Sequence, residues 1–364
     1  MITTINNKHN KLNVPNLRFK EFQGEWHSFL INEICSEFKS GKNIKADSIS
    51  ENGEYPVFGG NGLRGYTASY NHEGLYVLIG RQGALCGNVR SVNGKTYITE
   101  HAIAAAGNEK SNTSFLHYLF LKMNLGQYSD QSAQPGLAVN KLLKLKVSLP
   151  PISEQEKIAK LLSLLDERIA TQNKIIDKLQ SLIKGIRNDV FGKLRKNIGF
   201  NAVVGDVLDY EQPQPYIVEN TEYTAEGIPV LTANKAFVLG YTSETNGIYD
   251  KGDCIIFDDF TLDCKYVDFP FKVKSSAIKI LTAKNKELLR YTFEFLKYLD
   301  LSTEEHKRHY IAETQNQGII LPTEQMVKTI AHIFSTLSLR METAVKQRYV
   351  FEKQKQYLLR QMFI

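Results

Sequence analysis

The fold is decided by residues 149–191, LPPISEQEKIAKLLSLLDERIATQNKIIDKLQSLIKGIRNDVF, and by the related residues 321–363, LPTEQMVKTIAHIFSTLSLRMETAVKQRYVFEKQKQYLLRQMF. An offset of 172 places Leu149-Pro150 on Leu321-Pro322 and Phe191 on Phe363. Between these ends, Ile158-Ala159 falls on Ile330-Ala331. Self-similarity at a fixed offset is typical of a repeated structural unit. The chain is therefore predicted to contain one unit twice.

The regions that precede these two stretches also correspond. Tyr55-Pro56-Val57 matches Ile228-Pro229-Val230, and Gly65-Tyr66-Thr67 matches Gly240-Tyr241-Thr242. Each copy is thus predicted to be a globular region followed by a long helix. The predicted segments are a first globular domain (1–150), a first helix (151–198), a second globular domain (199–321) and a second helix (322–364).

Both helices carry an apolar seam with alternating spacings of three and four, as in a coiled coil. We expect the seam to contain Leu162, Leu165, Ile169, Ile176, Leu179 and Ile183 in the first helix and Phe334, Leu337, Met341 and Phe351 in the second. Because such seams are unfavourable in water, the two helices are predicted to pack against each other. The alternative is two separate amphipathic core helices. The first helix is expected to run from Glu154 to Phe191, with Ser153 as N-cap and Gly192 as C-terminal stop.

The globular regions are predicted to be mixed α+β. The runs YPVFGG, GLYVLIGR, CIIFDD and FPFKVKSSAIKI are short, rich in β-forming residues and bounded by turn residues. SFLHYLFLKM and KELLRYTFEFLKYL are the expected helices, one in each copy. Four scattered cysteines form no Cys-x-x-Cys pair and are expected to be small buried groups, not metal ligands.

Composition and charge narrow the class of protein. The 364 residues are 42% hydrophobic and 23% charged, which excludes intrinsic disorder. No apolar run reaches the roughly 20 residues that span a bilayer, and the N-terminus does not resemble a secretory leader, so we expect a cytoplasmic protein. Basic minus acidic residues give +5 for residues 1–150 and −7 for residues 199–321. Any contact of the second domain with nucleic acid must therefore be local.

One group of residues could support catalysis. Asp253, Asp263 and Lys265 fit the spacing of a Mg²⁺-dependent nuclease, in which carboxylates hold the ion and lysine polarises the phosphate. Charged loops often satisfy this short pattern, so a solvated acidic turn is the competing interpretation. Gly60-Asn61-Gly62-Leu63-Arg64-Gly65 fits a dinucleotide-binding fingerprint, but turn-forming and β-branched residues follow it where a helix would be needed.

The chain resembles the specificity subunit of type I restriction-modification systems over nearly its whole length. The resemblance is carried by LPPISEQEKIAKLLSLLDERI, its second copy, LRFKEFQGEW, GEYPVFGGNGLRGY, LIGRQGALCGNV and SAQPGLAVNKLLKLKVSLPP. It implies two target-recognition domains, each of which reads one half of a split double-stranded DNA sequence, and two helices packed antiparallel between them. It also implies two modification subunits, which bind S-adenosylmethionine and methylate adenine, and optional restriction subunits. The departures from the family are the acidic second domain and the charged Arg348 and Lys355 in the second seam.

The predicted function is therefore a non-catalytic DNA-specificity subunit that binds no cofactor, metal or membrane itself. S-adenosylmethionine, ATP and Mg²⁺ are expected on its partner subunits, and the Mg²⁺-dependent endonuclease is the alternative. Forked donors and amides read bases, whereas other basic and hydroxyl groups contact phosphates. The expected DNA-binding residues are Asn61, Arg64, Arg81, Gln82 and Gln134 in the first domain, and Asn234, Lys235, Thr261, Lys265, His306, Arg308 and His309 in the second. Arg81 pairing with a core carboxylate is the alternative for that residue.

Overall fold

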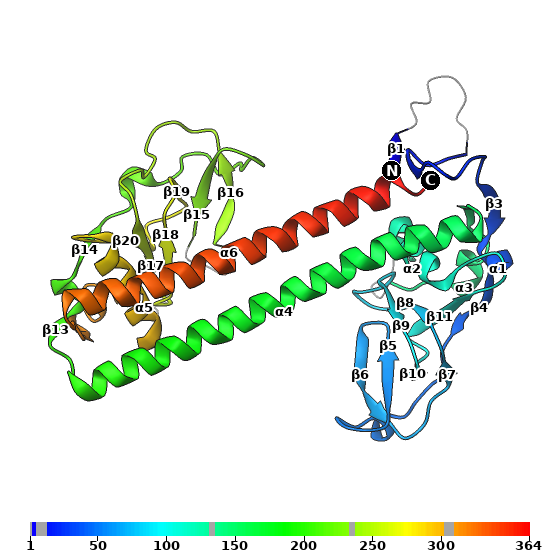
Figure 1. Ribbon diagram of the computed structural model, residues 1–364, viewed down its shortest axis with the longest axis horizontal. Coiled ribbons are helices and arrows are strands. Elements are labelled where there is room, and N and C mark those ends of the chain that lie inside the picture. The colour runs from blue at the N-terminus through cyan, green and yellow to red at the C-terminus, as the bar shows by residue number, and fades with distance from the viewer. Residues whose placement is uncertain (1, 5–12, 131–134, 233–236, 302–308) are drawn as a thin grey trace. The chain divides into compact units, whose positions relative to one another are not determined.

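A computed structural model describes residues 2–4, 13–130, 135–232, 237–301 and 309–364 (Figure 1). The chain forms two compact units. The first unit comprises Met1–Gln172 together with Gln347–Ile364, and the second unit comprises Asn173–Lys346. Each unit therefore contains one globular region and a share of both long helices. None of the described helices is both long enough and apolar enough to cross a membrane.

Each unit contains a four-stranded antiparallel sheet with the same strand order. In the first unit the order is β4-β11-β8-β9, and in the second it is β14-β20-β17-β18. The strands are β4 (Cys35–Ser40), β8 (Tyr76–Gly80), β9 (Val89–Val92), β11 (Ala102–Gly107), β14 (Leu208–Glu211), β17 (Cys254–Asp258), β18 (Cys264–Val267) and β20 (Ile278–Ala283). The predicted repeat is thus a repeat of topology.

A second sheet in each unit repeats as well. It pairs a central strand antiparallel with the next strand and parallel with a later one. The strands are β5 (Tyr55–Gly59), β6 (Gly62–Thr67), β7 (His72–Glu73) and β10 (Lys95–Ile98) in the first unit, and β15 (Ile228–Leu231), β16 (Val238–Thr242) and β19 (Lys272–Val273) in the second. Pro56 lies opposite Tyr66, and Pro229 lies opposite Tyr241. The sequence correspondence therefore extends to the cross-strand register.

Short elements complete the two units. A two-stranded sheet joins β3 (His27–Leu30) to β12 (Lys146–Leu149), and its counterpart joins β13 (Ala202–Val203) to β21 (Gly318–Ile319). The first unit also contains β1 (Ile2–Thr4), β2 (Leu17–Phe19), α1 (Ile31–Ile34) and α3 (Val139–Leu142).

One helix covers the four-stranded sheet of each unit: α2 (Thr113–Met123) or α5 (Lys286–Leu299). Both begin at an asparagine whose side-chain oxygen accepts a backbone N–H three residues later, at 3.1 Å for Asn112 and 2.7 Å for Asn285. This N-cap satisfies a donor that the first helical turn leaves unpaired. The two predicted globular helices are confirmed.

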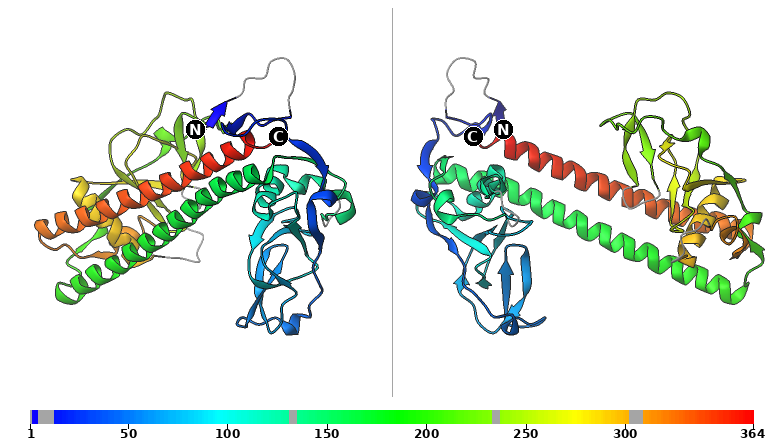
Figure 2. Two further views of the ribbon diagram at one scale, coloured as in Figure 1. Left: turned by 45° about the vertical axis from the view of Figure 1, so that its right-hand side comes forward. Right: turned by 180° about the vertical axis from the view of Figure 1, so that it is seen from behind.

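The long helices are α4 (Ile152–Asn197) and α6 (Glu324–Gln361), which lie side by side in the views of Figures 1 and 2. The expected ends of the first helix were wrong. Ser153 lies inside α4, and the helix continues through Gly192 to Asn197, shortly before the left-handed Gly199 with φ +73°. Burial of Phe191 and Leu194 outweighs the roughly 1 kcal/mol that glycine costs inside a helix.

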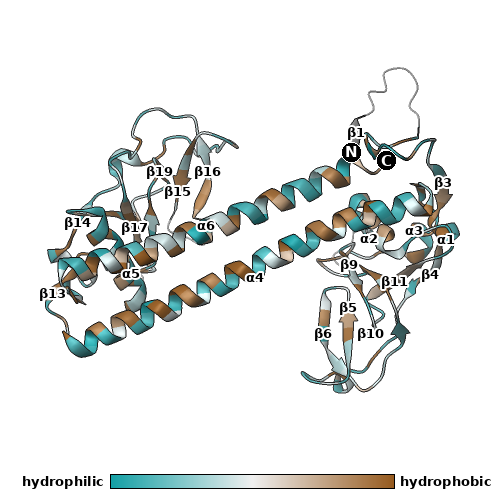
Figure 3. Cartoon of the chain, in the orientation of Figure 1, coloured by the Kyte–Doolittle hydropathy of each residue, from teal (hydrophilic) through white to brown (hydrophobic). Residues whose placement is uncertain are grey.

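The predicted seams are the least exposed faces of both helices, and apolar residues recur along both in Figure 3. Leu162, Leu165, Ile176 and Phe334 are buried, and Ile169, Leu179, Ile183, Leu337, Met341 and Phe351 are half-buried. Lys355 is accommodated by an ion pair with Asp166 of α4. Because Asp166 lies near the start of α4 and Lys355 near the end of α6, the helices run antiparallel. The expectation of packed antiparallel helices is confirmed.

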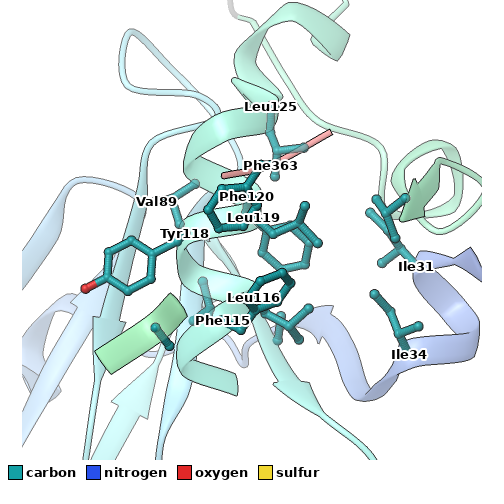
Figure 4. Close-up of a cluster of buried hydrophobic side chains, with 14 of the residues drawn as sticks. Ile31, Ile34, Val89, Phe115, Leu116, Tyr118, Leu119, Phe120, Leu125 and Phe363 are labelled. Atoms are coloured by element: carbon teal, nitrogen blue, oxygen red, sulfur yellow. The ribbon is translucent and has the colours of Figure 1, made fainter. Parts of the chain in front are cut away.

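Each long helix ends in a globular core. In the first unit Phe363, just after α6, stacks on Phe115 with ring centroids 5.1 Å apart, and Figure 4 shows it among the side chains of α2. In the second unit Phe191 near the end of α4 packs on Tyr291 and Phe295, with centroids 5.4 and 5.3 Å away. The two phenylalanines that correspond in the sequence therefore occupy corresponding places in the two cores.

Candidate nucleic-acid interface

The first unit presents a tight hairpin tip at Gly60-Asn61, between β5 and β6. The tip packs closely on neighbouring loops. A Cβ on Gly60 would lie 2.6 Å from the carbonyl oxygen of His101 and 3.3 Å from the Cα of Gly80. Only glycine permits this approach, so the glycines that resemble a dinucleotide fingerprint shape a hairpin. Asn61 is exposed at the apex.

The side chains of two arginines and the backbone of a third lie at this tip. Arg64, on β6, is exposed, and its Cδ would be 2.9 Å from a Cβ on Gly59. The Arg90 guanidinium, from β9, occupies the space that a Cβ on Gly62 would need. The backbone N–H of Arg81 donates to the His101 carbonyl at 2.9 Å beside Gly60. We call Arg64, Arg81 and Arg90 the arginine cluster.

No carboxylate of the described residues pairs with the arginine cluster, although many other basic side chains of the chain form ion pairs. The alternative in which Arg81 pairs with a core carboxylate therefore has no support within the described part of the chain. The neighbouring positive charges of Arg64 and Arg90, without counter-charges among the described residues, create a local potential that attracts anions. Sequence reasoning missed Arg90, because its place at the tip depends on a contact between two different sheets.

Gln82 lies next to the arginine cluster on the surface. Its Oε1 is 3.0 Å from the Nδ1 of His101. Because this contact engages the carbonyl oxygen of the amide, the NH₂ group is the part that can donate to a base edge. Asn61, Arg64, Arg81 and Gln82 are thus brought together by the fold. Gln134 lies outside the described residues.

The second unit is built differently at the equivalent positions. The backbone N–H of Asp259 donates to the Ala277 carbonyl at 2.9 Å, as that of Arg81 does to His101. Asp259 is 1% exposed, and its Oδ2 lies 3.6 Å from the Nζ of the equally buried Lys279. A position that carries a cation in the first unit therefore carries a buried carboxylate in the second.

The residues predicted to bind DNA in the second unit are only partly described. Thr261 is exposed in the turn after β17, and its backbone N–H donates to the Oδ1 of Asp258 at 3.2 Å. His309 is 1% exposed, with its Nδ1 3.0 Å from Glu313. Its burial gives no support to a DNA contact. Asn234, Lys235, His306 and Arg308 lie outside the described residues.

The carboxylates of the suggested nuclease site do not converge. Asp253 precedes β17 and accepts the hydroxyl of Tyr266 at 2.7 Å, whereas Asp263 lies at the other end of the β17–β18 hairpin. Asp263 pairs with Lys297 at 2.8 Å and with Lys265 at 3.0 Å. Although burial opposes ionisation, the hydrogen bonds from these lysines hold the pKa of Asp263 below its usual value. This region is therefore an acidic turn in which lysines neutralise the charge of Asp263.

The buried cysteines of the second unit are confirmed as core residues. Cys254 and Cys264 are buried and unbridged, and burial raises the pKa of both thiols to about 12. They contact different hydrophobic clusters, one on each face of the sheet.

Comparison with known proteins finds similarity over part of the chain. The sequence profile of the type I restriction modification DNA specificity domain matches residues 23–181. The EcoprrI specificity subunit of Escherichia coli is 44% identical over 154 residues, which cover 41% of this chain and 38% of that protein. The EcoR124I/EcoR124II specificity subunit of Escherichia coli is 46% identical over 126 residues, covering 33% and 31%. The match thus spans less than two fifths of either relative.

A solved structure extends the likeness to the whole fold. The type I restriction-modification S subunit from M. genitalium aligns with a TM-score of 0.76 and 16% identity, covering 96% of this chain and 99% of that one. At this identity the similarity concerns the fold. It confirms the α+β architecture predicted from the sequence, while the profile match confirms the predicted resemblance over residues 23–181.

Proposed function

We propose that the chain is the DNA-specificity subunit of a type I restriction-modification complex, and that it reads a bipartite, asymmetric target without catalysing a reaction itself. The observation that carries this proposal is the duplication of one sheet-and-helix unit. The two copies share their framework but differ in the side chains at equivalent loop positions, as Arg81 and Asp259 do. Two like frameworks with unlike loops are suited to recognise two unlike half-sites.

The proposal includes partners that follow from the family. The chain would assemble with two modification subunits, and in some assemblies with restriction subunits, on double-stranded DNA in the cytoplasm. S-adenosylmethionine, ATP and Mg²⁺ would bind to those subunits, while this chain supplies the sequence information.

Base reading in the first unit is assigned to the exposed donors at the hairpin tip. An arginine presents two parallel N–H groups to O6 and N7 of guanine, and a glutamine or asparagine amide matches adenine. Arg64 projects from β6 at an exposed position, so it has the reach to enter a groove. Asn61 and Gln82 supply the neighbouring amides.

Arg64→Ala or Arg81→Ala is expected to weaken binding of the preferred sequence by about 1–3 kcal/mol and to relax the preference at one base pair, because a forked contact to guanine is lost. The measurement is binding across a library in which every base of the first half-site is varied, at two salt concentrations. Wild-type specificity and salt dependence in both variants would remove these arginines from the interface.

Exchange of residues 1–150 for the corresponding domain of another specificity subunit is expected to change only one half of the recognised sequence. The donor domain must retain aromatic partners for Phe363 in the positions of Trp26 and Phe115, because these rings form one core. Mapping adenine methylation in the host genome with the wild-type chain, the exchanged chain and no chain measures the result. Unchanged methylation without the chain, or a change in both halves after exchange, would contradict the proposed function.

A further inference from the structure

Arg90 differs from the other members of the arginine cluster in how it is held. It lies on β9, opposite Leu78 of β8, so its backbone is fixed by the four-stranded sheet. The side chain crosses to the other sheet and rests on Gly62, whose φ of +110° and missing Cβ make room for the guanidinium. Arg64, in contrast, projects from the exposed hairpin itself.

The Nε atom of Arg90 is buried and has no hydrogen-bond partner among the described residues. Buried donors of folded proteins are nearly always paired, with protein, water or a ligand. No ion pair to the guanidinium is formed within the same part of the chain. A charged group that is held by packing, and not by a counter-charge of its own, is preorganised for an anion from outside.

The second unit keeps a basic residue at the matching place. Lys265 follows the buried Cys264 on β18, as Arg90 follows the buried Val89 on β9, and both strands form the same edge of their sheets. Lys265 lies opposite Ile256 of β17 in the register that places Arg90 opposite Leu78. This position therefore keeps a basic side chain although Arg81 is replaced by Asp259 nearby, but in the second unit that side chain pairs with Asp263 at 3.0 Å. Retention in both copies favours a role that does not depend on the base sequence.

We propose that Arg90 is a fixed phosphate-contacting residue of the first unit. This inference rests on the proposed function, because it assumes that the hairpin tip faces DNA. Arg90 is half-buried, and its backbone belongs to strand β9, so its guanidinium has little freedom to follow a base edge. In this proposal it contacts a phosphate of the duplex, while Arg64 and the neighbouring amides reach the base edges. Phosphate contacts fix the register of a protein on DNA but carry no sequence information directly.

The test uses Arg90→Met, which keeps an apolar stem over Gly62 while removing the charge, and Arg90→Lys, which keeps a charge. Lys95→Ala is the matched control. It removes one cation from an exposed position on β10. This strand belongs to the sheet that carries the Gly60-Asn61 hairpin tip, and Lys95 lies at the opposite end of that sheet. Binding of the full chain, assembled with its modification subunits, is measured on a randomised duplex library over a range of salt concentrations.

Arg90→Met is expected to weaken binding to all library members alike, by roughly tenfold or more, because a charge-assisted hydrogen bond is lost. The slope of log affinity against log salt should fall in magnitude by about one, and the selected sequence should stay the same. Arg90→Lys should retain the wild-type slope, and Lys95→Ala should match wild type in affinity and slope. Thermal unfolding of both Arg90 variants verifies that they are folded.

Three results would overturn the inference. They are a wild-type salt slope for Arg90→Met, an altered preference at one base pair, or equal losses for Arg90→Met and Lys95→Ala. If the wild-type assembly selects no sequence from the library, the proposed function fails instead. The two failures are therefore distinguishable.

Discussion

Glu154→Ala is expected to lower the free energy of unfolding by about 3–5 kcal/mol, the typical cost of removing one partner of a buried ion pair. Glu154 is fully buried, and Arg18 is 3% exposed. The guanidinium donates from Nε and Nη2 to the two carboxylate oxygens at 2.8 and 2.7 Å. Without the carboxylate, the arginine is a buried charge whose remaining hydrogen-bond partners among the described residues are the backbone carbonyls of Gln23 and Gly24. Chemical denaturation followed by circular dichroism measures the change.

The chain offers a matched control for this substitution. Glu324 is the carboxylate of the corresponding Glu-Gln pair at the start of α6, but it is exposed and pairs with Lys328 on the surface. Glu324→Ala is therefore expected to leave stability nearly unchanged. Replacing both Arg18 and Glu154 by apolar residues of similar size should recover most of the loss, because no unpaired charge remains. Equal effects of Glu154→Ala and Glu324→Ala would contradict the assignment of Arg18–Glu154 as a buried pair.

Under the proposed function, deletion of one heptad from α4 within Leu165–Lys178, with the facing heptad of α6, is expected to shorten the unspecified spacer between the two DNA half-sites. Seven residues of α-helix correspond to about 10.5 Å at 1.5 Å per residue, or about three base pairs of 3.4 Å. A seven-residue deletion keeps the apolar seam in phase. The facing heptad is set by the register in which Asp166 pairs with Lys355.

The spacer is read by mapping adenine methylation with the wild-type and the shortened chain. Deletion of the heptad from α4 alone serves as a control, because it places the two seams out of register and should abolish the activity. A shortened chain that is still active on the original spacer would disprove the idea that the helices set the spacing.

Much of the architecture could be predicted from the sequence because it follows from local patterns. Apolar residues from Leu162 to Ile183 recur at spacings of three and four, which predicts a long helix with one apolar face. Such a face must be buried against a partner. The offset between Phe191 and Phe363 predicted the duplication, and the structure places both rings in equivalent cores. The end of α4 was predicted wrongly, because Gly192 is a stop signal only where no tertiary packing opposes it.

The candidate interface was only partly predictable. Arg64 and Asn61 follow from a glycine-rich hairpin, which is a local feature. Arg90 lies 28 positions after Gly62, on which its side chain rests, and Arg18 and Glu154 are 136 positions apart. No spacing rule in the sequence joins such residues. His309 is of a residue type that can contact DNA, but the fold buries it beside Asp259.

The sequence by itself therefore determined the repeated unit, its α+β class and the two long helices that pack together, since periodicity and self-similarity reside in the order of residues. Only the tertiary structure decided which charges are buried in pairs and which remain without a counter-charge. That distinction depends on desolvation and on distances between segments that folding brings together. It is also what separates Arg18, which holds the first unit together, from Arg90, which is left available to an anion at the hairpin tip.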